Sequence, residues 1–287
     1  MAVVLSGMHI NKLSNDADFD SVCASIKSAL NCSKIEINEG NCRNIGIFVG
    51  TTFTNFNLRE ENAQKYFESG IRVVNPTLFP RCLISYLGGH FAAALNIKGC
   101  NATFSSGASG GLDALTEGLY FLKRNTNNKA LIVELGDTMQ DASSYTLKES
   151  ATWLIENSNN KDKKYADIVG IESSFESKGK NSGLIKAIGK ALGRGILDFN
   201  AIDYVFVSGI NNKDKFGLTK NAADHFGANK KQYIPFDYPG NTNDHGLFFI
   251  SNVLKNVISL RTKDKPQLAM FVSLGENTNS CCLVVEI

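Results

Sequence analysis

The sequence predicts an α/β protein built from two similar halves. Short apolar runs rich in branched residues alternate with longer segments whose apolar residues recur at helical spacing, as in proteins that alternate strands and helices. A polar stretch at residues 157–164 separates two series of such segments, and each series closes with two strands. We therefore expect an N-terminal half at residues 1–160 and a C-terminal half at residues 161–287, joined in one compact unit.

The elements of each half follow from these patterns. The N-terminal half is predicted to have strands at residues 3–5, 45–49, 102–105, 130–135 and 152–156 and helices at residues 19–30, 76–95 and 109–124. Asp16 or Asp18 suits the N-cap of the first helix, and Gly88 with Gly89 is the expected place for a break in the second. The C-terminal half is predicted to have strands at residues 168–172, 204–207, 233–236, 268–274 and 281–287 and helices at residues 183–197, 219–226 and 247–260.

Composition excludes several classes of function. The chain has 287 residues, is 43% hydrophobic and carries a net charge of +2, so nothing favours binding to nucleic acid or to an anionic membrane. The seven cysteines are odd in number and form no C-x-x-C pair, which fits a reducing compartment. We expect a cytoplasmic protein without membrane insertion, because no signal peptide or long apolar run is seen. No metal-ligand cluster or phosphate-binding loop is recognisable.

The segment from residue 99 to residue 111 is the most informative part of the sequence. It is predicted to form a short strand, a tight turn of small residues and the start of a helix. Reactive residues are often mounted at such turns, where the helix N-terminus favours negative charge. The residue at the apex is Ala108, whose methyl group has no reactivity. The turn therefore has the shape of a nucleophile site without the nucleophile.

Two catalytic alternatives remain open from the residues alone. Gly107 to Gly111 matches the G-x-S-x-G motif of α/β-hydrolases, which would make Ser109 a nucleophile. Asp237 or Asp244 with His245 would then complete a triad, although the preceding strand is more polar than a central hydrolase strand. The second alternative is a condensing enzyme that uses a displaced thiol. Cys82 or Cys100 would serve, but both are predicted away from the turn, where buried structural thiols are more common.

Several runs together resemble the β-ketoacyl synthases of the thiolase fold. The resemblance covers most of the chain, in the family's order. It rests on residues 3–8, 45–51 and 75–80, on Gly88 and Ala92, and on residues 99–111, 202–205, 240–241 and 273–279. It implies a thiolase-like αβαβα five-layered sandwich of two pseudo-repeated halves.

The resemblance also implies where the catalytic groups would lie. The family performs decarboxylative Claisen condensation with a cysteine at a helix N-terminus and two histidines. The cysteine position falls on Ala108, and the histidine positions fall on Ser208 and Asn241. A small shift of register does not restore the set, because the chain's histidines are His9, His90, His225 and His245.

A synthase-like chain without these residues resembles the chain-length factors, the inactive partners of type II polyketide ketosynthases. The resemblance implies a heterodimer with a catalytic ketosynthase that extends a polyene, aryl polyene or aromatic polyketide chain on an acyl carrier protein. The short chain is similar to the compact aryl-polyene type. No cofactor of its own is implied, since the carrier's phosphopantetheine enters the partner subunit. Family members often carry glutamine where this chain has Ala108.

Two further sets of residues follow from the resemblance. Phe53 and Phe56 fall where bulky side chains of chain-length factors close the acyl tunnel, because a buried aromatic fills the space of substrate carbons. The strand at residues 102–105 falls at the dimer seam, beside the preceding helix. The expected interface residues are Phe79, Tyr86, Phe91, Ala102, Thr103, Phe104 and Ser105.

Overall fold

A computed structural model gives the fold for residues 3–12, 19–51, 56–73, 75–76, 79–141, 144–157, 165–175, 182–207, 217, 221–222, 224–226, 233–235, 246–259, 266–274 and 279–287. These residues form one mixed sheet of ten strands. The strands are β1 (Val3–Lys12), β2 (Ile45–Thr51), β3 (Asn101–Ser105), β4 (Lys129–Asp141), β5 (Ser144–Asn157), β6 (Ala166–Phe175), β7 (Tyr204–Val207), β8 (Tyr233–Pro235), β9 (Leu268–Leu274) and β10 (Asn279–Glu286).

The strand order repeats between two halves of this sheet. Outward from its middle, one side reads β1-β5-β4-β2-β3 and the other reads β6-β10-β9-β7-β8. Pair directions repeat as well, because β2 is parallel to β3 and β4, and β7 is parallel to β8 and β9. Antiparallel pairing of β1 with β6, from Val3 opposite Ile168 to Leu5 opposite Ala166, joins the halves. The predicted boundary at residues 160 and 161 lies outside the described residues and stays a prediction.

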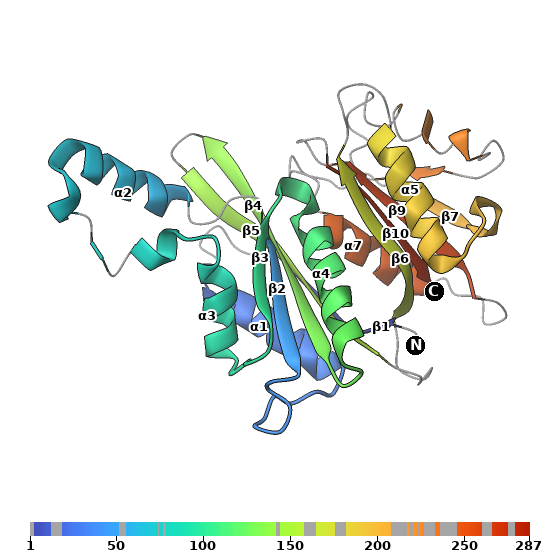
Figure 1. The fold of residues 1–287 in the computed structure, drawn as a ribbon, viewed down its shortest axis with the longest axis horizontal. Coiled ribbons are helices and arrows are strands. Elements are labelled where there is room, and N and C mark those ends of the chain that lie inside the picture. The colour runs from blue at the N-terminus through green and yellow to red at the C-terminus, as the bar shows by residue number, and fades with distance from the viewer. Residues whose placement is uncertain are drawn as a thin grey trace.

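Helices cover both faces of the sheet and fill the space between its halves (Figure 1). They are α1 (Phe19–Cys32), α2 (Phe56–Ser69), α3 (Tyr86–Ala94), α4 (Gly110–Arg124), α5 (Ser182–Gly195) and α7 (Gly246–Ser259), with short 3-10 turns η1 (Ile71–Val73), η2 (Phe79–Cys82), η3 (Gly107–Ser109) and η5 (Phe199–Ala201). In Figure 1, α4 and α7 lie centrally, whereas α2 projects from the molecule beyond α3.

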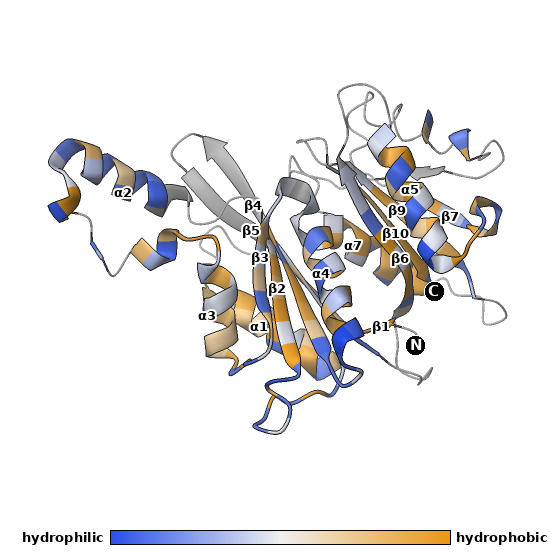
Figure 2. Cartoon of the chain, in the orientation of Figure 1, coloured by the Kyte–Doolittle hydropathy of each residue, from blue (hydrophilic) through white to orange (hydrophobic). Residues whose placement is uncertain are grey.

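Side-chain alternation along the strands produces the layers. In β4, Leu131 and Val133 join a core with α1 and α3, while Ala130 and Ile132 face the central core that contains α4 and α7. In the other half, the outward residues of β7, β9 and β10 pack against α5, and the inward ones join the same central core. The strands therefore appear mainly apolar in Figure 2. This arrangement confirms the predicted five-layered αβαβα sandwich.

One predicted helix is wrong over half its length. The α-helix expected at residues 76–95 is present only as α3, from Tyr86 to Ala94, and residues 79–82 form the 3-10 turn η2. Pro80 explains the difference, because proline has no N–H to donate to a preceding helical carbonyl. The chain stays helical through Gly88 and Gly89, where a break was expected. Strand β1 also continues to Lys12, well beyond the predicted residue 5.

The first turn of α4 lies directly on the backbone of β2. A Cβ atom added at Gly50 would lie 2.2 Å from the carbonyl carbon of Gly110 and 2.2 Å from the amide nitrogen of Gly111. Contacts this short are not possible, so the close approach of helix and strand requires glycine at position 50. The start of α4 is thereby fixed against the sheet.

We predict that Gly50→Ala destabilises the protein by about 3 kcal/mol or more, because neither backbone can move aside without disturbing the core. Gly193→Ala is the matched control, since a Cβ at this helical position meets no atom within 4 Å. It should leave stability unchanged or raise it by up to about 1 kcal/mol. Urea unfolding of both variants is the measurement, and equal stabilities would contradict the packing argument.

Candidate functional site

The candidate site is the turn between β3 and α4, and the structure places Ala108 in this turn. Gly107 has φ 66°, a left-handed conformation that glycine adopts without strain, and the chain then forms η3 before α4 begins at Gly110. The predicted strand, turn and helix are confirmed. The turn therefore leads from a strand at the edge of the sheet to a helix in the middle of the molecule.

Glu134 of β4 lies behind this turn and is 1% exposed. Its Oε1 accepts a hydrogen bond of 3.2 Å from the backbone amide of Gly111, at the start of α4. Its Oε2 accepts one of 2.7 Å from the amide of Phe248, at the start of α7. A Cβ at Gly111 would lie 2.3 Å from Oε1, so the carboxylate fills the space beside the helix. One side chain therefore binds the first turns of both central helices.

Opposing effects set the protonation of Glu134. Burial removes the carboxylate from water and raises its pKa to about 8, and the nearby charge of Glu149 adds to the increase. The amides of Phe248, Leu247 and Gly111 stabilise the ionised form and limit the increase. The carboxyl group therefore titrates within the physiological pH range.

A second acidic group, Asp113, stands in the first turn of α4. Burial raises the pKa of Asp113, while hydrogen bonds with the side chains of Ser106, Ser173 and Ser109 lower it. Two carboxyl groups thus lie in or against the first turn of α4. In their ionised form they disfavour a further negative charge, such as a thiolate or an oxyanion, at this place.

The described cysteines provide no substitute nucleophile at the turn. Cys100 precedes β3 at the strand end opposite the turn, and Cys82 ends η2; both are partly buried. Cys281 and Cys282 are fully buried, and burial is the main cause that raises the pKa of both thiols. The alternative of a displaced catalytic cysteine therefore gains no support.

Ser109 does not have the environment of a hydrolase nucleophile. Its side chain is 1% exposed, and its hydroxyl donates a hydrogen bond of 3.0 Å to the carbonyl oxygen of Ser106. The preceding strand is an edge strand, whereas a nucleophile elbow exposes its serine at the top of the sheet. Asp237, Asp244 and His245 lie outside the described residues.

Other residues expected at the site also lie outside the described part of the chain. These are Ser208, Asn241 and Phe53. Phe56 is the first residue of α2, but its side chain lies outside the description as well. The tunnel and the two histidine positions therefore stay predictions.

The expected interface residues fall into three groups. Phe79 in η2 is 57% exposed, and the strand residues Ala102, Thr103, Phe104 and Ser105 lie on β3, which pairs with β2 and is the last strand on its side of the described sheet. Tyr86 is half-buried and stacks on His90, with 5.1 Å between ring centroids. Phe91 is 1% exposed and stacks on Phe19 at 4.8 Å within the chain's own core. Phe91 is therefore a core residue, and its assignment to the interface is wrong.

Sequence reasoning missed a cluster of exposed apolar side chains beside η2. We name it the arm patch; it consists of Tyr66, Phe67, Ile71, Val73, Phe79, Leu83 and Ile84. Phe67 is 83% and Ile71 is 71% exposed, and a groove of about 450 Å³ runs between α2 and η2. Part of the signal was the run of apolar residues around Pro76 and Pro80, which the sequence assigns to the helix expected at residues 76–95, with Phe79 among the expected interface residues. Glu134 was also missed, although a lone carboxylate inside the apolar run at residues 130–135 indicates a special environment.

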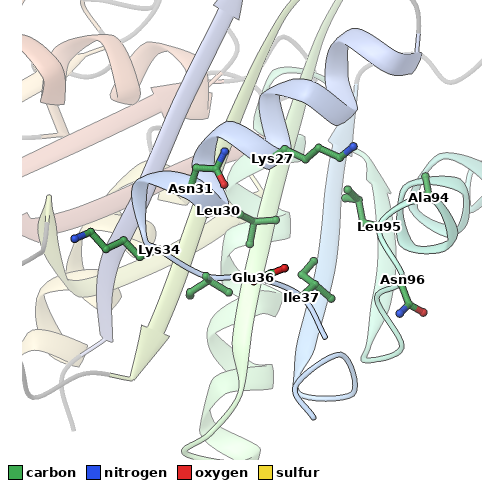
Figure 3. Close-up of a pocket in the computed structure, with 10 residues that line it drawn as sticks. Lys27, Leu30, Asn31, Lys34, Glu36, Ile37, Ala94, Leu95 and Asn96 are labelled. Carbon is green, nitrogen blue, oxygen red and sulfur yellow. The ribbon is translucent and has the colours of Figure 1, made fainter. Parts of the chain in front are cut away.

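A larger cavity, of about 520 Å³, lies on the outer face between α1 and the end of α3. Figure 3 shows Leu30, Ile37 and Leu95 lining it, with Lys27 and Lys34 near its rim. It is formed by different elements from the turn and contains no catalytic arrangement of side chains.

Among the described residues, no cluster of three or more His, Cys, Asp or Glu side chains could hold a metal ion. None of the described helices has the length and apolar character needed to cross a membrane.

Comparison with known proteins shows the fold. A β-ketoacyl synthase from Burkholderia phymatum STM815 is 13% identical, with a TM-score of 0.77 over 99% of both chains. A second similar structure is a type II polyketide acyl-carrier protein in complex with its ketosynthase bound to the hexaketide. It is 13% identical, with a TM-score of 0.74 over 99% of both chains. A third is a ketosynthase in complex with its chain length factor from Xenorhabdus doucetiae. It is 12% identical, with a TM-score of 0.70 over 100% of this chain and 98% of that one. The chain has the thiolase-like ketosynthase fold.

Sequence similarity is confined to a shorter segment. No protein-family model matches the chain. The 3-oxoacyl-(acyl-carrier-protein) synthase 2 of Vibrio cholerae serotype O1 is 30% identical over 84 residues, which are 29% of this chain and 20% of that enzyme. The aligned part thus spans one fifth of this curated relative.

We predict that Glu134 makes stability depend on pH. Its pKa is about 8 when folded and near the ordinary 4.5 when unfolded, so the folded protein binds the extra proton between these values. The stabilisation is complete below about pH 4.5 and is lost as pH rises to about 8. Urea unfolding from pH 5 to pH 9 should show the parent losing stability relative to Glu134→Gln up to about pH 8, with no further change above it. Parallel curves for the two proteins would contradict the assignment.

Proposed function

We propose that this chain is a non-catalytic chain-length-factor subunit, which pairs with a catalytic ketosynthase during type II polyketide elongation. The observation that carries the proposal is the β3–α4 turn, which keeps the shape of a nucleophile site but holds Ala108. A methyl group cannot form the thioester that condensation requires. The partner would supply the cysteine and the two histidines, and this chain would shape the acyl tunnel.

The environment of the turn supports a role without chemistry. Condensation develops negative charge at the helix N-terminus, which positive partial charges and free donors would stabilise. Here the Gly111 amide is bonded to Glu134, and Asp113 stands in the same helix turn. Both features oppose anion formation at the place where the family forms one.

Two structurally similar proteins support a ketosynthase and an acyl carrier protein as the partners of this chain. One similar structure is a ketosynthase with its chain length factor, and another is an acyl-carrier protein with its ketosynthase. By analogy, the partners of this chain are a ketosynthase subunit and an acyl carrier protein whose phosphopantetheine enters the ketosynthase. A heterodimer in the cytoplasm, of the compact aryl-polyene type, is the finer form of the proposal.

The surface supports pairing of this chain with the ketosynthase at one edge of the sheet. Strand β3 has five residues and lies at the edge of the described sheet, and an edge strand can add another chain. The opposite edge, β8, spans Tyr233–Pro235 in the described part of the chain, and Pro235 has no N–H to donate. The arm patch continues the surface, since η2 contacts α3 and α3 contacts β3. An apolar patch of this kind beside an open edge suits a large, permanent interface.

We predict that the chain forms a stable complex when co-expressed with a ketosynthase encoded beside it. Phe67→Asp and Ile71→Asp should weaken this complex roughly tenfold or more, because each places a charge in an apolar interface. Ile196→Asp is the matched control: Ile196 is 92% exposed but lies just after α5, away from the arm patch. Titration by biolayer interferometry gives the affinities.

Two results would contradict the pairing. One is an affinity that falls equally for the control and the arm variants. The other is a homodimer of this chain that elongates acyl-carrier-protein substrates without a ketosynthase, since that would require a nucleophile of its own.

We predict that Phe53→Ala lengthens the product made by the complex, because removing a tunnel-filling ring leaves room for further substrate carbons. Phe56→Ala is the parallel variant for the second expected tunnel residue. Mass spectrometry of the released acyl chains gives the length distribution. Unchanged distributions in both variants would exclude these residues as the tunnel stop.

A further inference from the structure

We propose that Glu134 is a positioning residue that fastens the first turn of α4 to the first turn of α7 and occupies an amide that would otherwise stabilise an anion at position 108. This inference concerns the turn itself and holds whether or not the chain pairs with a ketosynthase.

The first argument is the geometry of the carboxylate. Its two oxygens accept from Gly111 and Phe248, which belong to different halves of the chain. The helices that begin there are counterparts, since α4 follows β3 and α7 follows β8 in the repeated strand order. The amides of a helix's first turn have no partner within the helix and need one when buried. Glu134 provides that acceptor for both helices at once.

The second argument is the position of Glu134 in its strand. Alternation places Ile132 on the central face of β4, and Glu134 lies on the same face two residues later. A leucine at position 134 would suit this layer by packing alone. It would take from the Phe248 amide its 2.7 Å carboxylate acceptor, which is unfavourable for a buried donor. The carboxylate therefore suits the junction of two helix starts better than an apolar side chain would.

The third argument concerns the electrostatics of the turn. A helix start favours a nearby anion through its dipole and its free amides. At α4 the Gly111 amide is already bonded to Glu134, and once Glu134 ionises, near pH 8, its charge also opposes a second anion. Glu149 on β5 is buried beside it and adds to the same opposition. Restoring a cysteine at position 108 would therefore not restore an acidic thiol.

The experiment introduces that cysteine with and without the carboxylate. In Ala108→Cys and in the double variant Ala108→Cys/Glu134→Gln, the rate of iodoacetamide alkylation is followed against pH, and mass spectrometry reads it at residue 108. Cleavage after Lys98 and Lys123 releases one peptide that also contains Cys100, which serves as an internal reference. We expect the pKa of the introduced thiol to be at or above the ordinary value of about 8.5 in the single variant. It should fall by about one unit or more in the double variant, while the alkylation rate of Cys100 at each pH stays the same.

Folding is checked on the same samples. The single tryptophan, Trp153, is buried and donates a 2.6 Å hydrogen bond to Ser251 of α7, so its fluorescence reports the docking of that helix. Glu134→Asp is the second substitution, because it keeps the charge but is too short to reach both amides. With Ala108→Cys it should give a smaller fall in thiol pKa than Glu134→Gln.

The result that overturns the proposal is an equal thiol pKa with and without Glu134 in folded protein. If neither double variant folds, the Ala108→Cys variant alone tests the proposal. A thiol pKa well below 8.5 with Glu134 present would show that the helix start is still available to an anion, whereas a value at or above 8.5 supports the proposal.

Discussion

The burial of the first turn of α4 is the constraint on which the centre of the molecule depends. This turn lies against the backbone of β2 with no space for a side chain at Gly50, and water cannot reach its amides. Buried amides require acceptors, and Glu134 supplies one while also binding the start of α7. The same small region therefore packs the central layer, positions Ala108 and holds the two halves in contact.

The two halves keep the same strand order but differ in what they add to it. In the first half, the chain between β2 and β3 spans residues 52–100 and contains α2, η1, η2 and α3; the corresponding connection between β7 and β8 spans residues 208–232. The larger connection carries the arm patch and stands beside the open edge of β3 (Figure 1). The repeated strand order builds the core, and the larger connection in the first half adds the exposed arm patch.

Much of the fold follows from the sequence, because buried strands and amphipathic helices impose periodic patterns that survive without tertiary information. The strand, turn and helix around Ala108 were predicted in this way, and the resemblance supplied the five layers. Apart from Phe79, the residues of the arm patch were not predicted, since an apolar run looks the same whether the fold covers it or leaves it exposed. Phe91 was misplaced for the converse reason: its contact with Phe19 joins segments far apart in the sequence. Glu134 depends on Gly111 and Phe248, and no local pattern brings those three residues together.

The unequal edges of the sheet also limit how the protein can assemble. A sheet with two open edges can add neighbours on both sides and grow into a fibre. Among the described residues, β8 comprises three and ends in Pro235, whereas β3 comprises five. If strands are added at β3 alone, each chain can pair with one partner. The outer edges of the joined sheets are then β8 strands, which offer few backbone groups for further pairing. The asymmetry that favours β3 as the proposed binding edge would thus also favour a finite assembly over a fibre.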